Sequence, residues 1–252
     1  MVSVNLKGGL GNMMFQIAFI EDLARRGGFE VRYPDIDNVF QTLLKSGHSQ
    51  NCYDYLSIFR NFDWRKNQDK PMPNRIVHIP HHYEYIEPVD NMIYDGYFQS
   101  ERYFDKGETL KLFEPANDVK KSLVRNNSVS IHVRRGDYIS KYSDTYEELT
   151  SDYYIKALKE IGKYNEVYVF SDNKIWCVDN FPFDCTFPNN SNYVQMFMMA
   201  QCRDNIIANS SFSWWGAYLN QNPDKKVIAP AKWYKTDRYS AKDIYTSNMI
   251  II

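Results

Sequence analysis

The chain has 252 residues, of which 44% are hydrophobic and 24% charged, enough apolar material for one large domain or two small ones. Its 30 Lys and Arg residues and 31 Asp and Glu residues leave a formal net charge of −1. A protein that binds nucleic acid through the phosphate backbone carries a basic excess, so the charge balance argues against a nucleic-acid partner. The longest apolar run is five residues, 196–200. A bilayer span needs roughly 20, so we expect no transmembrane segment.

The N-terminus and the cysteines indicate a reducing compartment. Lys7 and the glycines after it interrupt any signal-peptide core. The four cysteines form no C-x-x-C pair and His81-His82 is the only histidine cluster, so we expect free thiols and no zinc site. The sequence therefore predicts a metal-free cytoplasmic protein, either free or attached peripherally to the inner face of a membrane. The cysteines are Cys52, Cys177, Cys185 and Cys202.

The first 34 residues read as a strand, a turn, a helix and a second strand. Residues 2–6 alternate apolar and polar side chains, as in a strand, and a glycine turn over residues 8–12 follows. Helical spacing of apolar residues begins at Met14, two glycines end the helix, and residues 29–33 look like a second strand. The aromatic, proline-punctuated stretch from Asp35 to about Pro115 shows no clear pattern.

The second half of the chain alternates predicted strands and helices after a boundary at residues 114–118. Such alternation predicts a parallel sheet with helices on both faces. Together with the first unit it indicates two Rossmann-like domains, 1–115 and 116–252, facing a cleft. The predicted strands are 128–133, 167–170, 185–187, 205–208 and 227–229, and the predicted helices begin at Ser151, Tyr193 and Trp214. The final apolar run, 249–252, fits either the core or a partner surface.

Polar groups follow each of four predicted strands, at the edge where parallel sheets bind ligands. They are residues 8–12, 134–137, 171–173 and 209–213. This convergence carries more weight than any single motif.

The segment from His132 to Asp137 offers an imidazole and two adjacent guanidiniums, and guanidiniums match phosphate oxygens in shape and charge. A surface Arg–Asp pair at a strand end is the alternative. Residues 209–215 place hydroxyls and backbone N–H groups at a helix start, which favours phosphate, although capping by Ser211 or Ser213 explains them equally well. Asp172 fits either a contact to a ribose or base, or an ordinary helix cap.

The glycine turn fits a dinucleotide fingerprint only in part. Gly9 and Gly11 match, and Asp35 or Asp37 could supply the acid, but Met14 occupies the third glycine position. No Walker lysine motif occurs either. The residues by themselves favour a nucleotide-diphosphate ligand.

Five ordered blocks of the sequence resemble the α-1,2-fucosyltransferases, from residue 3 to about residue 233. The first block reads G-G-L-G-N-M-M-F-Q from Gly8, and the third reads H-V-R-R-G-D-Y from His132. The others are residues 96–104, 170–172 and 207–219.

The resemblance implies a GT-B-like architecture and inverting transfer of L-fucose from GDP-β-L-fucose to the 2-hydroxyl of a galactosyl glycan, without a metal. Arg134 would bind the β-phosphate and stabilise the leaving group. His132 would contact the nucleotide or pyrophosphate, and Asp172 the nucleoside. The other implied donor contacts are Gly9, Gly11, Asn209, Ser210, Ser211 and Phe212.

The general base is open between two residues. The resemblance points to Asn12, which as an amide would position the acceptor or relay through water, and Asp137 is a candidate carboxylate. Arg135 either touches ligand or braces the loop through Asp137. Met13 stands where the family usually has Gln, and the region 35–95 is short, so acceptor choice is open. The alternatives are another linkage, a non-catalytic nucleotide-sugar-binding module and an NAD-type oxidoreductase.

Overall fold

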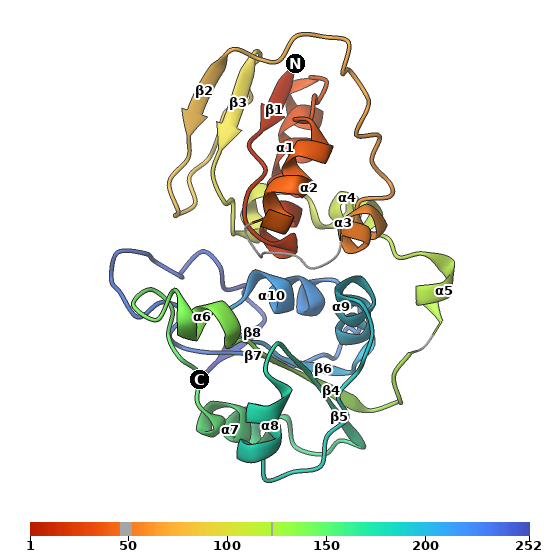
Figure 1. Ribbon diagram of the computed structural model, residues 1–252, viewed down its shortest axis with the longest axis vertical. Coiled ribbons are helices and arrows are strands. Elements are labelled where there is room, and N and C mark those ends of the chain that lie inside the picture. Colours follow the sequence, from red (N-terminus) through yellow and green to blue (C-terminus); the bar gives the residue numbers. More distant parts are fainter. Residues whose placement is uncertain (46–51, 122) are drawn as a thin grey trace. The chain divides into compact units, whose positions relative to one another are not determined.

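The computed structural model describes residues 1–45, 52–121 and 123–252 as an α/β protein with parallel sheets (Figure 1). The chain divides into two compact units. The N-terminal unit comprises Met1–Glu114 and Lys242–Ile244, and the C-terminal unit comprises Pro115–Ala241 and Tyr245–Ile252. The division falls beside the predicted boundary. The return of residues 242–244 to the first unit is not indicated by the sequence.

The sheet of the N-terminal unit has three parallel strands in the order β1-β3-β2. They are β1 (Val2–Val4), β2 (Arg75–His78) and β3 (Met92–Asp95). The predicted order of strand, turn and helix is confirmed, and α1 (Leu10–Gly27) ends at Gly28 in the left-handed conformation as expected. The predicted bounds are wrong, because β1 already ends at Val4 and α1 begins at Leu10, inside the predicted turn and before Met14. The predicted strand at 29–33 is wrong: of the described residues there, Val31 alone forms an isolated bridge, to Val2. Pro34 and the helix cap at Asp35 end the extended segment immediately afterwards.

The core of the N-terminal unit is built around Phe19 of α1. Its ring stacks on that of Phe98 with centroids 3.8 Å apart, and the rings of Tyr94 and Tyr103 meet it edge-on. This apolar cluster ties α1 to the segment after β3. The remaining helices of the unit are α2 (Ile36–Lys45), α3 (Cys52–Ile58), η1 (Glu101–Tyr103) and α4 (Lys106–Leu112).

The sheet of the C-terminal unit has five parallel strands in the order β5-β4-β6-β7-β8. The chain goes from β4 to β5 on one side and then returns to β6 on the other, which creates a topological switch point between β4 and β6. The C-terminal apolar run forms β8 and thus completes the sheet. The strands are β4 (Ser128–Val133), β5 (Glu166–Ser171), β6 (Asp204–Ile206), β7 (Val227–Ala229) and β8 (Met249–Ile251).

The two faces of this sheet carry different side chains. Val129, Ile131 and Val133 join an apolar cluster with α7 and α8, on the lower face in Figure 1. On the opposite face, under α9 and α10, Asn205 donates a 2.7 Å hydrogen bond to the Ser130 hydroxyl. The helices of the unit are α5 (Asn117–Lys120), α6 (Gly136–Ser140), α7 (Ser151–Ile161), α8 (Lys174–Asn180), α9 (Asn192–Gln201) and α10 (Ser211–Tyr218).

Three predicted boundaries in this unit need correction. The segment 185–187 makes only an isolated bridge, between Thr186 and Tyr168, in the described chain. The strand predicted at 205–208 spans Asp204–Ile206, and the helix predicted from Trp214 begins at Ser211. In the two strand segments a local pattern of apolar residues extends beyond the backbone pairing that the sheet permits, whereas α10 begins earlier than its tryptophans because Ser210 caps it.

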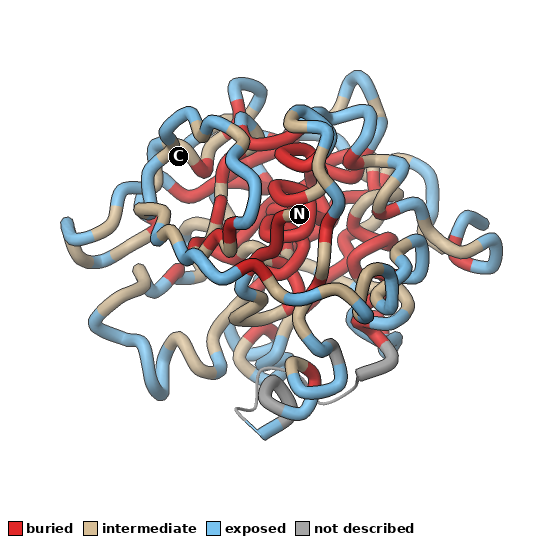
Figure 2. The backbone as a smooth tube through the Cα atoms, turned by 90° about the horizontal axis from the view of Figure 1, so that it is seen from above, coloured by how far each residue is buried: buried red, intermediate tan, exposed pale blue. Residues whose placement is uncertain are grey.

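Figure 2 colours the backbone by burial. The buried residues (red) lie mainly on inner segments of the chain, and the exposed residues (pale blue) lie mainly on outer loops. Within the described ranges, no helix combines the length and apolar character that crossing a bilayer requires. Cys177, Cys185 and Cys202 are free thiols. The side chain of Cys52 lies outside the described residues.

Candidate active site

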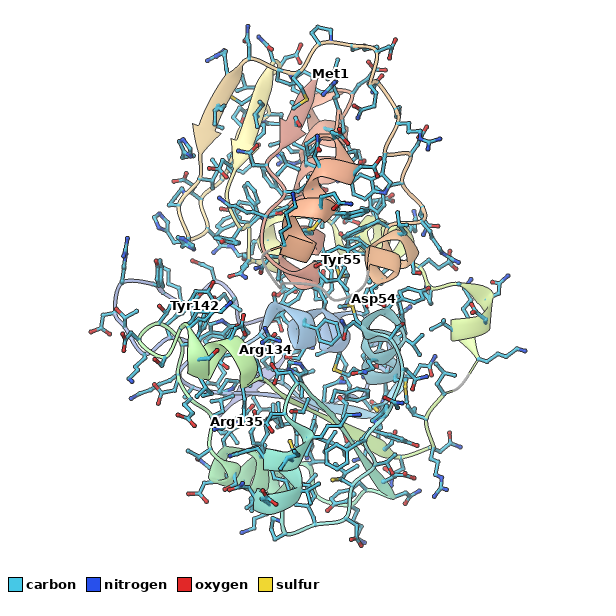
Figure 3. All side chains as sticks on the ribbon, in the orientation of Figure 1. Met1, Asp54, Tyr55, Arg134, Arg135 and Tyr142 are labelled. Carbon is cyan, nitrogen blue, oxygen red and sulfur yellow. The ribbon has the colours of Figure 1, made fainter. Side chains whose placement is uncertain are left out.

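Three strand ends of the C-terminal unit meet at one edge of its sheet. Because β4 lies between β5 and β6, the residues that follow these strands are neighbours across the switch point. Arg134 and Arg135 follow β4, Asp172 follows β5, and Asn209 and Ser210 follow β6. Figure 3 labels Arg134 and Arg135 in this unit. The structure therefore brings together the predicted donor-binding residues that lie in the second half of the chain.

Arg134 lies between two carboxylates. Its Nη2 is 2.5 Å from Oδ1 of Asp137, on the first turn of α6, and its Nη1 is 3.0 Å from Oδ2 of Asp172. The guanidinium also lies over the ring of Tyr138, 5.5 Å from the centroid. About a third of the Arg134 side chain is exposed (34%), so the cation is fixed in place and still accessible to an anion.

Arg135 is turned away from this cluster and is braced by other residues. Its guanidinium pairs with Glu148 at 2.8 Å and lies over the ring of Trp176 at 4.2 Å. The side chain is only 13% exposed. The alternative in which Asp137 braces Arg135 is not observed, because Asp137 lies three residues after Arg134 at the start of α6 and pairs with Arg134 instead.

Asp172 uses both carboxylate oxygens within the protein. Oδ1 accepts a 2.9 Å hydrogen bond from the backbone N–H of Arg135, and Oδ2 pairs with Arg134. A Cβ on Gly136 would lie 2.8 Å from Oδ2, so a glycine is needed here for the close approach. Asp172 is therefore not the helix cap weighed from the sequence, since Asn173 caps α8. A contact to a nucleoside would compete with its bonds to the arginines.

His132 is buried in β4, with 7% of its surface exposed, and its ring lies 5.5 Å from that of Phe212. Burial, and secondarily the charge of Arg134, lowers the pKa of His132 to about 3. The imidazole is therefore neutral near pH 7. Its Nδ1 has no hydrogen-bond partner in the described part of the chain. A neutral ring at this edge can bind a nucleotide through hydrogen bonds or stacking, without adding charge.

The segment after β6 is fixed by buried hydrogen bonds. Asn209 is fully buried, and its amide donates 2.8 Å bonds to the carbonyl oxygens of Glu147 and Trp233. Ser210 caps α10 by accepting a bond from the N–H of Phe212, so the alternative of a cap at Ser211 or Ser213 does not hold. Ser211 and Phe212 occupy the first turn and are half-buried. The start of α10 is therefore capped by Ser210, and the next two residues are still partly accessible.

A row of tyrosines lies beside Arg134 and was missed by the sequence analysis. Tyr138 and Tyr146 stack with centroids 4.0 Å apart, and Tyr146 contacts Tyr142 and Tyr234. Tyr142, labelled in Figure 3, is 39% exposed. Tyr138, Tyr142 and Tyr146 follow one another at a spacing of four residues, whereas Tyr234 comes from a distant segment, so the local pattern does not predict its contact.

In the N-terminal unit, the glycine turn connects β1 to α1 as predicted. Gly8 has a φ of 77°, and a Cβ there would meet the Asn12 side chain at 2.5 Å. Gly9 is the N-cap, and no described atom lies within 4 Å of where its Cβ would be, which leaves room for a ligand. Asn12 accepts a 2.8 Å hydrogen bond from the side-chain amide of Gln99. Gly11 is buried in the first turn of α1.

Two expectations about this turn are corrected. Met13 is fully buried in the core, so its side chain does not face a ligand as a determinant of acceptor choice. Asp35 does not end a strand as a dinucleotide-binding acid would. Its carboxylate instead accepts hydrogen bonds from the backbone N–H of Asp37 and the side chain of Asn38 at the start of α2.

A second cluster, of Lys7, His78 and Asp95, lies at the carboxyl ends of the three strands of the N-terminal sheet. Asp95 contacts both of the other side chains. The three residues are far apart in the sequence and belong to no motif, so only the sheet pairing reveals them. The described residues contain no group of three or more His, Cys, Asp or Glu arranged to hold a metal ion.

The fold is shared with solved glycosyltransferases. NodZ α-1,6-fucosyltransferase, in crystals soaked with GDP-fucose, aligns with a TM-score of 0.51 at 13% identity over 86% of this chain and 92% of that one. Fucosyltransferase NodZ from Bradyrhizobium aligns with a TM-score of 0.52 over 85% and 91% of the two chains, also at 13% identity. The protein thus has the GT-B fold of these neighbours.

Within that class, the chain belongs to glycosyl transferase family 11, whose profile matches residues 1–252. It is 30% identical to an α-1,2-colitosyltransferase of Escherichia coli, over 96% of this chain and 95% of the relative. It is equally similar to the O-antigen biosynthesis glycosyltransferase WbnK of Escherichia coli, at 30% over 91% and 93%. Galactoside α-(1,2)-fucosyltransferase 2 of Sus scrofa is 28% identical, over 87% of this chain and 69% of that relative.

Proposed function

We propose that this protein transfers L-fucose from GDP-β-L-fucose to the 2-hydroxyl of a galactose residue, with inversion at the anomeric carbon and without a metal ion. The observation that carries the proposal is the Arg134 cluster at the switch point of the C-terminal sheet. The names of relatives from bacteria and mammals agree on an α-1,2 linkage, which supports the position of attack. The family supports the reaction class.

The C-terminal unit supplies the donor side of the reaction. Arg134 pairs with the β-phosphate as the bond from the sugar to this phosphate breaks, so its positive charge offsets the charge that develops on GDP. To do so it exchanges a carboxylate partner, Asp137 or Asp172, for phosphate oxygens. The neutral ring of His132, the first turn of α10 and the backbone around Asn209 form the wall beside the nucleotide.

The N-terminal unit supplies the acceptor side. Asn12, fixed by Gln99, positions the acceptor by hydrogen bonding, because an amide has no basicity to take a proton. Asp137 is a poor candidate for the general base, since one of its oxygens already holds Arg134. The turn at Gly9 leaves space for substrate.

The experiment distinguishes fucose from colitose as the transferred sugar, because one relative is named an α-1,2-colitosyltransferase. Colitose is 3-deoxy-L-fucose, so GDP-fucose and GDP-colitose differ only in the 3-hydroxyl. Purified protein is incubated in EDTA with GDP-fucose, GDP-colitose or GDP-mannose, and with lactose or 2′-deoxylactose as matched acceptors. We expect GDP release and a Fuc-α-1,2-Gal product only with GDP-fucose and lactose.

Each other outcome contradicts a stated part of the proposal. If product forms only from GDP-colitose, colitose and not fucose is the transferred sugar. If product forms with 2′-deoxylactose, the linkage is not to the 2-hydroxyl of galactose. Activity lost in EDTA and restored by Mg²⁺ or Mn²⁺ would disprove metal independence. GDP binding, seen as a thermal shift, without any transfer would favour a binding module, and stabilisation by NAD instead of GDP an oxidoreductase.

A further inference from the structure

The cluster around Arg134 carries more negative than positive charge. One guanidinium faces two carboxylates, those of Asp137 and Asp172. The neighbouring Arg135 does not offset this excess, because its own guanidinium pairs with Glu148. A diphosphate is an anion, and like charges brought together at a binding site repel each other strongly. One of the two carboxylates must therefore leave Arg134 before a phosphate can take its place.

The two carboxylates differ in what else holds them. Both are 26% exposed, so exposure does not distinguish them. Asp172 Oδ1 also accepts a 2.9 Å hydrogen bond from the backbone N–H of Arg135. Gly136 lies so close that a Cβ there would be 2.8 Å from Asp172 Oδ2. If Asp172 turned away, it would lose its contacts to Arg134 and to the backbone together.

The carboxylate of Asp137 has a single hydrogen-bonded partner within the described ranges, Nη2 of Arg134 at 2.5 Å. The backbone beside Asp137 is held by the next residue. Tyr138 donates a 3.0 Å hydrogen bond to the carbonyl oxygen of Asn209 and stacks on Tyr146 with centroids 4.0 Å apart. Releasing Asp137 from Arg134 therefore needs only the rotation of one short side chain, while α6 stays where it is.

We propose that Asp137 competes with the nucleotide for Arg134: it pairs with Arg134 in the free protein, is displaced by the β-phosphate, and pairs with Arg134 again as GDP leaves. Asp172 stays in place throughout and positions the guanidinium. This inference rests on the proposed function, in which Arg134 binds the β-phosphate. Product release limits the turnover of many enzymes. A competing carboxylate lowers the affinity for product GDP, so Asp137 favours release after each transfer.

The first test measures the binding of GDP to the purified protein by isothermal titration calorimetry. For Asp137→Asn we expect the Kd of GDP to fall by about 10-fold, because the amide carries no charge to compete with the phosphate. The rate constant of GDP dissociation should fall by a similar factor. A variant with a distorted site would lose affinity, so a gain in affinity distinguishes competition from a structural role. Asp137→Ser removes the same carboxylate and should show the same gain.

Two matched variants and one matched ligand make the test specific. Asp144→Asn removes the same charge at an exposed position in the turn after α6 and should bind GDP as wild type does. Asp172→Asn removes the same charge from the other side of Arg134. We expect it to weaken GDP binding by about threefold or more, because the guanidinium loses the partner that positions it. GMP has no β-phosphate, so Asp137→Asn should bind GMP as wild type does.

Three outcomes would overturn the inference. The first is GDP binding by folded Asp137→Asn and Asp137→Ser that is unchanged or weaker than in wild type. The second is an equal gain in affinity from Asp144→Asn or Asp172→Asn, and the third is an equal gain for GMP. If wild-type protein neither binds GDP nor transfers a sugar, the proposed function itself fails. That outcome is distinct from wild-type binding of GDP that Asp137→Asn does not strengthen.

Discussion

The two sheets carry different chemistry at the same edge. After β4 and β5 in the C-terminal unit, a guanidinium that stays charged at every physiological pH lies between two carboxylates. At the last residues of β2 and β3 in the N-terminal unit, an imidazole is hydrogen-bonded to one carboxylate. A permanent cation suits an anionic ligand, whereas an imidazole held by a carboxylate presents its other nitrogen for hydrogen bonding. The same kind of sheet edge thus presents different side chains in the two units.

At the two edges, burial and not residue type distinguishes the two histidines. His132 is 7% exposed and stays neutral down to about pH 3. His78, 79% exposed, has its Nδ1 on a carboxylate and its other nitrogen accessible. A desolvated imidazole such as that of His132 can accept or donate a hydrogen bond but cannot readily gain charge.

The largest expected effect concerns the permanent cation. We predict that Arg134→Ala lowers kcat/KM by at least ~100-fold, about 3 kcal/mol of transition-state stabilisation, because the neighbouring Arg135 is held by Glu148 and Trp176 and does not replace its charge. Initial rates of GDP release measure the effect. Arg125→Ala serves as the control, since Arg125 is 80% exposed and pairs with Glu166 near the opposite ends of the strands. Near-normal rates in folded Arg134→Ala would remove the cation from the mechanism.

A smaller effect concerns the pH dependence of stability. The unfolded chain protonates His132 near the ordinary pKa of 6.5, whereas the folded chain keeps it neutral to about pH 3. Between these values the unfolded state binds one more proton, so this contribution to stability is complete above pH 6.5 and decreases as the pH falls. The slope is about 1.4 kcal/mol per pH unit.

Urea unfolding from pH 7 to pH 4 measures this contribution. As the pH falls, the free energy of unfolding of His132→Gln should decrease less steeply than that of wild type. The two slopes should differ by up to about 1.4 kcal/mol per pH unit. His82→Gln, at an exposed position, should follow wild type. Equal slopes for His132→Gln and wild type would show that the folded protein admits the proton, and the contrast between the two histidines would be lost.

The smallest effect concerns the helices that begin at the two edges. Ser210 caps α10 with its side chain, whereas α1 begins at Gly9, which has no side chain to do so. We predict that Ser210→Ala destabilises the protein by about 1 kcal/mol, measured by urea unfolding. Thr150→Ala is the matched control, because Thr150 is the N-cap of α7 and, within the described residues, makes no side-chain cap bond. A loss at Thr150 as large as that at Ser210 would contradict the role of the Ser210 hydroxyl.

Local patterns predicted the parts of the fold that depend on neighbours in sequence. The alternation at 128–133 and the helical spacing after Ser151 reappear as β4 and α7. The extended residues around Val31 and Thr186 form only single bridges, because a strand also needs a partner that continues alongside it. The C-terminal run at 249–252 was ambiguous for the same reason: its role as β8 depends on pairing with β7.

In the candidate site, too, local features could be predicted from the sequence and contacts between segments could not. The motif around Arg134 and its place after a strand were readable from the sequence, but the partners of the two arginines were not. Asp137 pairs with Arg134 because α6 begins there, and Arg135 turns to Glu148 and Trp176. A charged side chain takes the partner that the backbone geometry offers, and spacing alone does not specify that geometry.

The amino-acid sequence by itself determined the alternation of strands and helices, the family motifs and the residues that follow β1, β4, β5 and β6. These features depend on periodicity and on short-range turn chemistry, which the order of residues encodes directly. Only the tertiary structure decided that Lys7, His78 and Asp95 meet and that His132 is buried while His78 is exposed. Contact and burial arise from parallel pairing between segments that are distant along the chain, so no local pattern contains them.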